Sequence, residues 1–224
     1  MLSLSLNYPK KSHRKIINIP QESTDLAELM GIILGDGGIG NKWQIVISLN
    51  SISDIQYSRY IFKLINHLFS LNPAIRKRPN QNTLVIVSSS SNMVDFIVNK
   101  GMVRGNKILQ NIDMPDWIRN NSEDQKRFIR GLVDTDGCLY IHKHTLKGRL
   151  YRNIGFCFAS HSRNLIISVS KTLLQFGIKP HITKDGFQIY LYSEHAVLEY
   201  LSIFGSSNDR ITQKYEEWRG RIVA

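Results

Sequence analysis

Two aspartates stand at matching places in a duplicated nine-residue pattern. Residues 29–37 read LMGIILGDG and residues 129–137 read IRGLVDTDG, so Asp36 and Asp136 each follow an apolar run and precede a glycine. Carboxylate oxygens are the ligands that Mg²⁺ prefers in proteins. The duplication therefore raises the question of how the chain could bring two distant acids to one place.

Each acid is predicted to lie on the last turn of a helix. A carboxylate there meets the negative end of the helix dipole, at a cost of roughly 0.3–1 kcal/mol, so we expect a positive group nearby. Gly37 and Gly137 fit the left-handed position that ends many helices.

Small residues four apart lie on one face of each predicted helix. They are Gly31 with Gly35 in the first copy, and Gly131 with Thr135 in the second. If these faces meet, the two backbones approach as closely as in small-xxx-small helix pairs, and both acids arrive at one place. The plainer interpretation is two ordinary buried helices with solvated acids, which a single copy would fit equally well.

The two stretches resemble the motifs of the LAGLIDADG homing endonucleases in their single-chain form, and the likeness in element order covers most of residues 24–219. The resemblance implies an α+β fold of two pseudo-twofold related αββαββα halves. Each half would form a saddle-shaped antiparallel sheet, with the motif helices packed at the interface. It also implies a site-specific enzyme, encoded within a mobile intron, that cuts both strands of a long asymmetric DNA target with Mg²⁺.

Two alternatives stay open, because the family also includes intron maturases and inactive relatives. One is a splicing cofactor that binds intron RNA, and the other is a DNA-binding protein that does not cut. Retention of both acids favours cleavage.

Composition supports a polyanionic partner. The chain has 224 residues, 42% of them hydrophobic, and a formal net charge of +11. This balance favours nucleic acid or an anionic membrane surface. No apolar run reaches the roughly 18 residues that cross a bilayer, and the first six residues are too short and uncharged for a signal peptide. We expect a soluble monomer with no membrane partner, in a prokaryotic cytoplasm or the organelle where its intron resides.

The order of the predicted elements divides the chain. We expect a basic tail over 1–23, a first half over 24–112, a linker over 113–121 that contains Pro115, and a second half over 122–224. The tail is either solvated or a basic arm on the phosphate backbone; its charged residues are Lys10, Lys11, His13, Arg14 and Lys15. Each half is predicted to run helix, two strands, helix, two strands, helix, with the later helices at about 53–70, 92–100, 162–176, 194–204 and 209–219.

Alternation along the predicted strands assigns one face to the core and one to solvent. The polar face could enter the major groove of DNA, where Arg reads guanine and Asn or Gln reads adenine. For any single position a plain solvated side chain is equally compatible. The candidates are Gln44, Ser48, Asn50, Arg76 and Arg78 in the first half, and Tyr140, His142, His144, Arg149, Tyr151, Asn153, Gln188, Tyr190 and Tyr192 in the second.

The resemblance also implies roles near the acids. Asp36 and Asp136 would hold two or more divalent cations together with the preceding residues, Gly35 and Thr135. Basic residues near the active sites would be Lys107 and Arg210, with Lys214 as a competitor for the second place.

The chain departs from the family at the end of the second strand. Many relatives have a glutamine there that orders water, whereas this chain has Leu49 or Asn50 in the first half and Ser160 or His161 in the second.

Three further residue groups receive plain interpretations. Asp134 is expected to point away from Asp136 and to be structural or solvated. His142 and His144 lack a nearby third ligand and are expected to be polar surface. Cys138 and Cys157 show neither zinc-ligand spacing nor a disulfide framework, so reduced thiols in strands are expected.

Overall fold

The computed structural model describes residues 14–220. Lys10, Lys11 and His13 of the predicted tail lie outside the described residues. No helix within residues 14–220 is long and apolar enough to cross a membrane.

The first half follows the predicted order of elements. It begins with helix α1 (Thr24–Leu34) and a hairpin of β1 (Gly37–Asn41) and β2 (Gln44–Asn50). Helix α2 (Ile55–Phe69), strands β3 (Ala74–Lys77) and β4 (Thr83–Ser89), and helix α3 (Ser91–Asn99) complete it. The four strands pair antiparallel in the order β1-β2-β4-β3.

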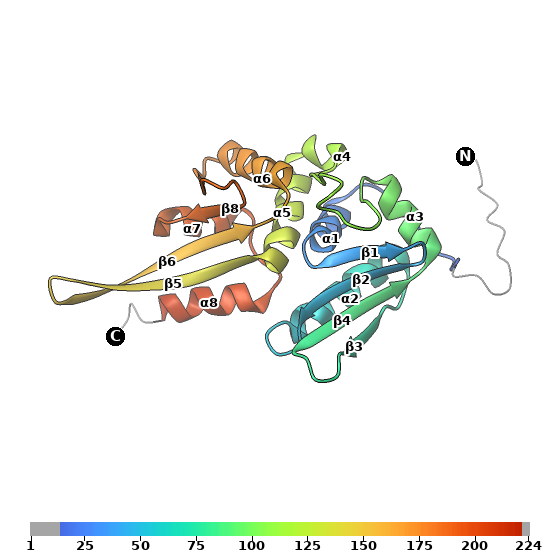
Figure 1. The fold of residues 1–224 in the computed structure, drawn as a ribbon, viewed down its shortest axis with the longest axis horizontal. Coiled ribbons are helices and arrows are strands. Elements are labelled where there is room, and N and C mark those ends of the chain that lie inside the picture. The colour runs from blue at the N-terminus through green and yellow to red at the C-terminus, as the bar shows by residue number, and fades with distance from the viewer. Residues whose placement is uncertain (1–13, 221–224) are drawn as a thin grey trace.

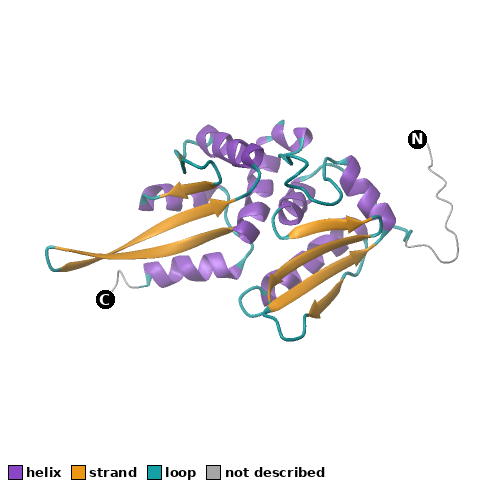
Figure 2. Ribbon diagram, viewed as in Figure 1, coloured by secondary structure: helices purple, strands orange, loops and turns teal. Residues whose placement is uncertain are grey.

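The second half repeats this arrangement and adds a helix. Its elements are α5 (Ser122–Asp136), β5 (Gly137–Leu146), β6 (Arg149–Ala159), α6 (Arg163–Gln175), β7 (His181–Ile182), β8 (Gln188–Leu191), α7 (Glu194–Ile203) and α8 (Asp209–Arg219). The sheet order, β5-β6-β8-β7, matches the first half. The β5–β6 hairpin projects beyond the rest of its half, and α1 and α5 lie between the two sheets (Figures 1 and 2). The predicted α+β fold of two similar halves is confirmed.

The predicted linker contains one short helix, α4 (Asp116–Arg119). Asn121 then caps α5, because its side-chain oxygen accepts a hydrogen bond from the Glu123 amide at 2.9 Å. A matching cap begins α1, where the Ser23 hydroxyl accepts from the Leu26 amide at 3.4 Å. These caps satisfy amides that lack a partner in the first turn, and the two motif helices begin at Thr24 and Ser122, the first residues of the two predicted halves.

Glycines bring the two motif helices into backbone contact. A Cβ atom on Gly31 would lie 2.1 Å from the carbonyl oxygen of Phe128, and one on Gly131 would lie 2.2 Å from that of Glu28. Closer to the acids, a Cβ on Gly35 would lie 1.9 Å from the Thr135 hydroxyl oxygen. The predicted close packing of the small faces is therefore confirmed.

The predicted left-handed conformation of Gly37 and Gly137 is wrong. Gly137 has φ −100°, and neither glycine has a positive φ. Both instead begin strands that turn back over the last helical turn. A Cβ on Gly37 would lie 2.6 Å from Ile33 Cα, and one on Gly137 would lie 2.5 Å from Val133 Cγ1. Glycine is needed at these two positions for space rather than for backbone angle.

Alanine at Gly31 should destabilise the protein strongly. The added methyl would meet a backbone carbonyl of the facing helix, which cannot rotate away, so we expect a loss of about 3 kcal/mol. Gly38 is the matched control, because a Cβ there meets nothing within 4 Å. Thermal melts of Gly31→Ala and Gly38→Ala check this, and equal melting temperatures would contradict it.

The described end of the tail packs on α3. The Arg14 guanidinium donates to the Asn92 side chain at 3.1 Å and lies 3.5 Å from the Asp95 carboxylate. Asn92 in turn donates to the Lys15 carbonyl at 2.8 Å. Residues 14 and 15 therefore belong to the folded first half.

Candidate functional site

The two motif acids meet at the same end of the paired helices. Asp136 is the last residue of α5, and Asp36 lies between α1 and β1. A Cβ on Gly35 would lie 3.4 Å from an Asp136 carboxylate oxygen, so this carboxylate reaches the end of α1. Burial, followed by the charges of Asp136 and Asp54, raises the pKa of Asp36 to about 6. Burial likewise raises the pKa of Asp136 to about 6.

A lysine covers the end of α1. The Lys107 ammonium donates to the carbonyl oxygens of Leu34 and Gly35, and to that of Gly37 at 3.0 Å. Burial lowers the pKa of Lys107, and the nearby charges of Asp136 and Asp36 oppose this shift. The ammonium therefore supplies the positive group that the helix end requires.

An arginine covers the end of α5 in the same way. The Arg210 guanidinium donates to the carbonyl oxygens of Asp134 and Gly137, each at 3.1 Å, and to that of Thr135 at 3.4 Å. Its competitor Lys214 instead pairs with Glu217 on the surface of α8, at 2.8 Å. Arg210, and not Lys214, therefore has at α5 the place that Lys107 has at α1.

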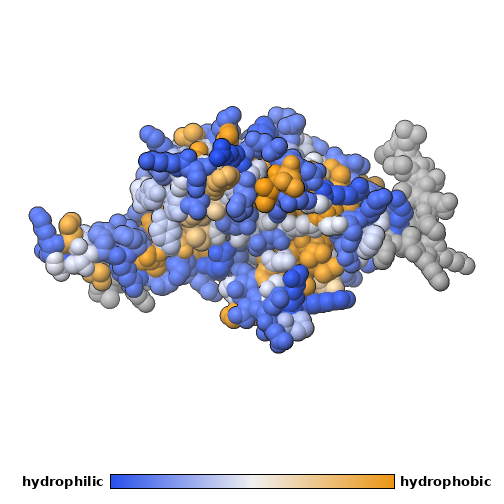
Figure 3. All heavy atoms as spheres, viewed as in Figure 1, coloured by the Kyte–Doolittle hydropathy of each residue, from blue (hydrophilic) through white to orange (hydrophobic). Residues whose placement is uncertain are grey.

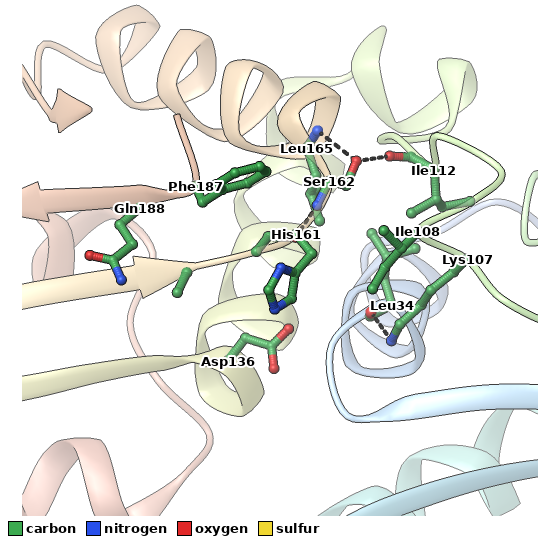
Figure 4. Close-up of a pocket in the computed structure, with 12 residues that line it drawn as sticks. Leu34, Lys107, Ile108, Ile112, Asp136, His161, Ser162, Leu165, Phe187 and Gln188 are labelled. Carbon is green, nitrogen blue, oxygen red and sulfur yellow. Dashed lines mark hydrogen bonds between the residues drawn. The ribbon is translucent and has the colours of Figure 1, made fainter. Parts of the chain in front are cut away.

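The Asp136 pocket draws on both halves of the molecule. Lys107 comes from the first half, whereas Asp136, His161 and Gln188 come from the second. The His161 ring points toward the Asp136 carboxylate, and the Lys107 side chain reaches in from the other side (Figure 4). An acid from one half therefore shares its pocket with a cation from the other.

The Asp36 pocket has the reciprocal composition. Asp36, Asn50 and Asp54 come from the first half, whereas Thr135 and Arg210 come from the second. Each pocket thus contains one motif acid and one cationic side chain from the other half. Both pockets contain an amide side chain, but the imidazole of His161 lines only the Asp136 pocket and the second carboxylate, Asp54, lines only the Asp36 pocket.

Asp54 is a component of the site that the sequence does not reveal. Its carboxylate accepts from the Asn50 amide at 3.0 Å and from the Asn208 side chain at 3.1 Å, and lies 3.6 Å from the Arg210 guanidinium. In sequence Asp54 reads only as a helix cap, yet its side chain forms no capping bond to α2. Asp54 lies beside Arg210 only because the two halves are in contact. Such a contact produces no pattern in the sequence around Asp54.

The candidates for the water-ordering position can now be separated. Leu49 is a core residue with 4% exposure, which excludes it. The Asn50 side-chain oxygen accepts from the amides of Ile52 and Ser53, and the Ser160 hydroxyl accepts from the Ser162 amide. His161 forms no hydrogen bond to any residue in the described part of the chain, so its ring nitrogens are available to the pocket.

The donor set suits a cation that a substrate helps to bind. Among residues 14–220 no group of three or more His, Cys, Asp or Glu side chains could hold a metal ion. Mg²⁺ is commonly bound through one or two carboxylates plus substrate phosphates, and Asp36 with Asp136 fits that pattern. The carbonyls of Gly35 and Thr135 already accept hydrogen bonds from Lys107 and Arg210, although each oxygen keeps a second lone pair.

The first sheet presents the predicted polar face. Ile45, Ile47 and Leu49 of β2 are buried, so the alternate residues of this strand face the other way. Arg76 and Ser48 both pair with Val85, so they lie in one row across this face. Gln44 and Asn50 share this face as predicted, whereas Arg78 follows the end of β3 and its amide donates to the Thr83 carbonyl at 2.9 Å.

The corresponding face of the second sheet is aromatic. The rings of His142, His144 and Tyr151 stack at centroid distances of 5.4 Å. Tyr190 stacks on Tyr192 at 5.3 Å, and its ring contacts Tyr140 edge-on at 6.4 Å. The strand register also places Arg149, Asn153, Gln188 and His181 on this face.

His181 was not predicted on this face. It pairs with Tyr190, and its ring lies 5.5 Å from that of Tyr192. The two-residue strand β7 that carries it is too short to show alternation. His142 is exposed and His144 is half-buried, which fits the prediction that they belong to the polar surface.

Residues 123–214 match the model of the LAGLIDADG-like domain. The second half of this chain is therefore similar to a LAGLIDADG-like domain. The similarity covers α5 with Asp136 and extends into α8 beyond Arg210. The resemblance stated from the sequence is confirmed for this half by an independent comparison.

Solved structures extend the likeness to both halves. A crystal structure of I-DmoI in complex with DNA and Mn superposes with a TM-score of 0.56 and 21% identity, covering 83% of this chain and 98% of that one. The I-LtrWI LAGLIDADG homing endonuclease bound to target DNA gives a TM-score of 0.61 at 12% identity, covering 90% and 91%. At these identities the comparison establishes a shared LAGLIDADG fold.

A curated relative belongs to a different functional class. The probable cell division protein WhiA of Streptococcus thermophilus is 22% identical over 203 residues, which are 86% of this chain and 63% of that protein. The chain therefore spans less than two thirds of the length of this relative.

Within the LAGLIDADG-like half, Asp134 has the structural role that was predicted. Its carboxylate accepts from the Ser206 hydroxyl and, at 2.7 Å, from the Ser207 amide. Burial raises its pKa to about 7, and the hydrogen bonds from Ser206 and Ser207 oppose the shift. Asp134 thus anchors the segment before α8, which carries Arg210.

Cys138 and Cys157 are free thiols in strands, as predicted. The sequence analysis did not predict that they pair directly across β5 and β6. The neighbouring Cys157 thiol lowers the pKa of Cys138 to about 6, and the Cys138 thiol raises the pKa of Cys157.

Proposed function

We propose that this chain is a site-specific, divalent-metal-dependent DNA endonuclease that cuts both strands of a long asymmetric target. The observation that carries the proposal is the pair of motif acids, each half-buried in a pocket with a cation from the other half. Burial raises the cost of ionising both acids, and the charge of Asp136 adds to that cost at Asp36. A protein that only binds DNA has no use for two such carboxylates.

Metal ions at these acids would polarise a phosphate, help to form hydroxide from water and stabilise a leaving oxygen. Asp36 and Asp136 would bind them, with the carbonyls of Gly35 and Thr135 as additional oxygen ligands. Lys107 and Arg210 keep the helix ends positive enough for a polyanion to approach. His161 would orient water in the Asp136 pocket, and Asn50 would have this role in the Asp36 pocket.

The two sheet faces would bind the two halves of the target. Guanidinium and amide groups dominate the first face, whereas rings dominate the second, so the half-sites should differ in sequence. Hydrophilic residues cover most of the projecting β5–β6 hairpin (Figure 3), and the net charge of +11 suits a phosphate backbone. I-DmoI and I-LtrWI, which share the fold, were solved with DNA.

The experiment that tests the proposal is cleavage of a random-sequence plasmid library by the purified chain, with Mg²⁺ or with EDTA. Discrete ends with short 3′ overhangs that appear only with Mg²⁺ are expected, and sequencing them gives the target. No metal-dependent ends at adequate library depth, from a folded protein, would overturn the endonuclease.

A DNA-binding protein that does not cut is the second candidate. The similarity to the cell division protein WhiA over 86% of this chain favours it, since that relative is not described as a nuclease. Selection of bound duplexes from the same library separates the two, because this candidate requires sequence-specific binding without cleavage. The RNA-binding alternative stays a prediction.

Arg76→Ala is expected to relax discrimination at one or two base pairs by about 1–3 kcal/mol. The Arg76 guanidinium lies on the proposed groove-facing side and forms no hydrogen bond or ion pair within residues 14–220. Lys77→Ala is the matched control, because Lys77 is the next residue and its register partner Leu84 lies on the opposite face. Affinities for single-base variants of the selected site check this. A loss spread evenly over all sequences would show a phosphate contact instead.

A further inference from the structure

The two cysteines of this chain lie opposite each other although 18 residues separate them in sequence. Cys138 on β5 pairs with Cys157 on β6 in the antiparallel register. Directly opposed residues of an antiparallel pair point to the same face of the sheet, so the two side chains are cross-strand neighbours. Both residues are partly exposed, and the sequence contains no other cysteine.

The backbone spacing of such a pair suits a covalent link. Directly opposed residues on antiparallel strands have Cα atoms about 4.5 or 5.5 Å apart. Disulfides accept Cα separations of about 4.4–6.8 Å. The thiols can therefore join without a change in strand pairing, through side-chain rotation and a small local adjustment.

We propose that Cys138 and Cys157 form a reversible cross-strand disulfide, which makes this strand pair an oxidation-sensitive site on the protein. The oxidant would be a small-molecule disulfide such as oxidised glutathione. One cysteine thiolate attacks a reagent sulfur, forms a mixed disulfide and releases one reagent thiolate. The second cysteine then attacks the protein sulfur of that mixed disulfide and releases the second thiolate. The protein loses two protons and two electrons, and the reagent disulfide becomes two thiols.

The pair lies at a sensitive place in the molecule. Cys138 follows Gly137, whose carbonyl oxygen accepts a hydrogen bond from the Arg210 guanidinium at 3.1 Å. Cys157 pairs on its other side with Tyr190, within the aromatic face. If that face binds duplex DNA, which is the part that rests on the proposed function, bound DNA covers both thiols.

The test treats the folded full-length chain with oxidised glutathione, quenches with N-ethylmaleimide and measures intact mass. The expected product is about 2 Da lighter than the reduced protein, takes no maleimide and recovers two labels after reduction. Cys157→Ser is the control, and it should stop at a stable glutathione adduct on Cys138. Two maleimides on the treated wild type, two stable glutathione adducts, or covalent dimers in place of the internal disulfide would overturn the proposal.

A second arm separates this inference from the proposed function. With a saturating selected duplex, oxidation is expected to slow at least about fivefold, since reagent access is then blocked. An unchanged rate with the duplex demonstrably bound would overturn the placement of the pair under DNA. A failure to obtain any bound or cut duplex tells against the proposed function, and it leaves the first arm intact.

Discussion

Replacement of Asp36 or Asp136 by asparagine is expected to lower the rate of DNA cleavage by about 1,000-fold or more. The amide keeps the shape of the side chain but removes the charge that would hold a divalent cation, and such a cation contributes several kcal/mol to the transition state. Binding of the target should stay within a few-fold of wild type, because the sheet faces are unchanged. End-labelled duplexes and a binding assay in Ca²⁺ check both parts. Full cleavage by either variant would overturn the ligand assignment.

The same variants should be more stable than wild type at pH 8 in EDTA. The pKa of each acid is raised from an ordinary 3.8 to about 6 in the folded state. The corresponding stability is fully present below pH 3.8 and is lost as pH rises through 6, so the ionised acids destabilise the fold at pH 8. Asparagine removes this penalty, and we expect a gain of about 1–2 kcal/mol, or several degrees in melting temperature.

Two comparisons make this stability result specific. The gain should shrink as the pH falls from 8 to 4, and Mg²⁺ should raise the melting temperature of wild type more than that of either variant. Asp116→Asn is the control, because its side chain is 97% exposed. A gain that is equal at both pH values, or equal in the control, would contradict the explanation.

The sequence predicts the sheet faces well because alternation is a local property. Ile45, Ile47 and Leu49 point into the core. The alternate residues of the same strand, such as Gln44 and Ser48, must therefore point to the opposite face. The same reasoning placed the second-half candidates, and the structure confirms the side on which they lie. Whether any of them contacts DNA is a separate question that strand register does not answer.

Contacts across the halves were harder to predict, because they depend on distance in space. The sequence predicts that a cation offsets each motif acid, yet it cannot show that Lys107 shares a pocket with Asp136 or that Arg210 shares one with Asp36. Asp54 reads as a helix cap for the same reason. These features follow from the helix pairing, which the small residues fix.

The cysteine pair was within reach of the sequence. A two-residue turn at Lys147 and Gly148, both with positive φ, pairs Leu146 with Arg149. Counting outward along the two strands reaches Cys138 opposite Cys157, as the register shows. The spacing rules applied to the cysteines considered only neighbours in sequence, and so missed a contact that the hairpin creates.

Arg130→Met should cost about 3–5 kcal/mol of stability, a fall of roughly 10 °C or more in melting temperature. Glu28 on α1 is fully buried, and its carboxylate accepts from Arg130 on α5 at Nε, 3.1 Å, and at Nη2. The hydroxyls of Tyr60 and Ser207 donate to it at 2.8 and 2.9 Å. Methionine fills part of the space but removes the guanidinium that contacts both carboxylate oxygens, which leaves the Arg127 guanidinium, 3.3 Å from one of them, as the remaining counter-charge.

The pH dependence and a double variant show whether loss of the counter-charge to Glu28 causes the fall in stability. Burial already raises the pKa of Glu28, an effect that Arg130 opposes, so without Arg130 the acid should take up a proton more readily. Acidification then relieves the penalty, and the deficit of Arg130→Met should be smaller at pH 5 than at pH 8. Glu28→Gln combined with Arg130→Met should recover most of the loss, whereas Lys214→Met, which breaks an exposed pair, should cost less than about 1 kcal/mol. If Arg130→Met melts no lower than Lys214→Met, the buried pair does not hold the two halves together, and the packing of Gly31 against Gly131 must do so alone.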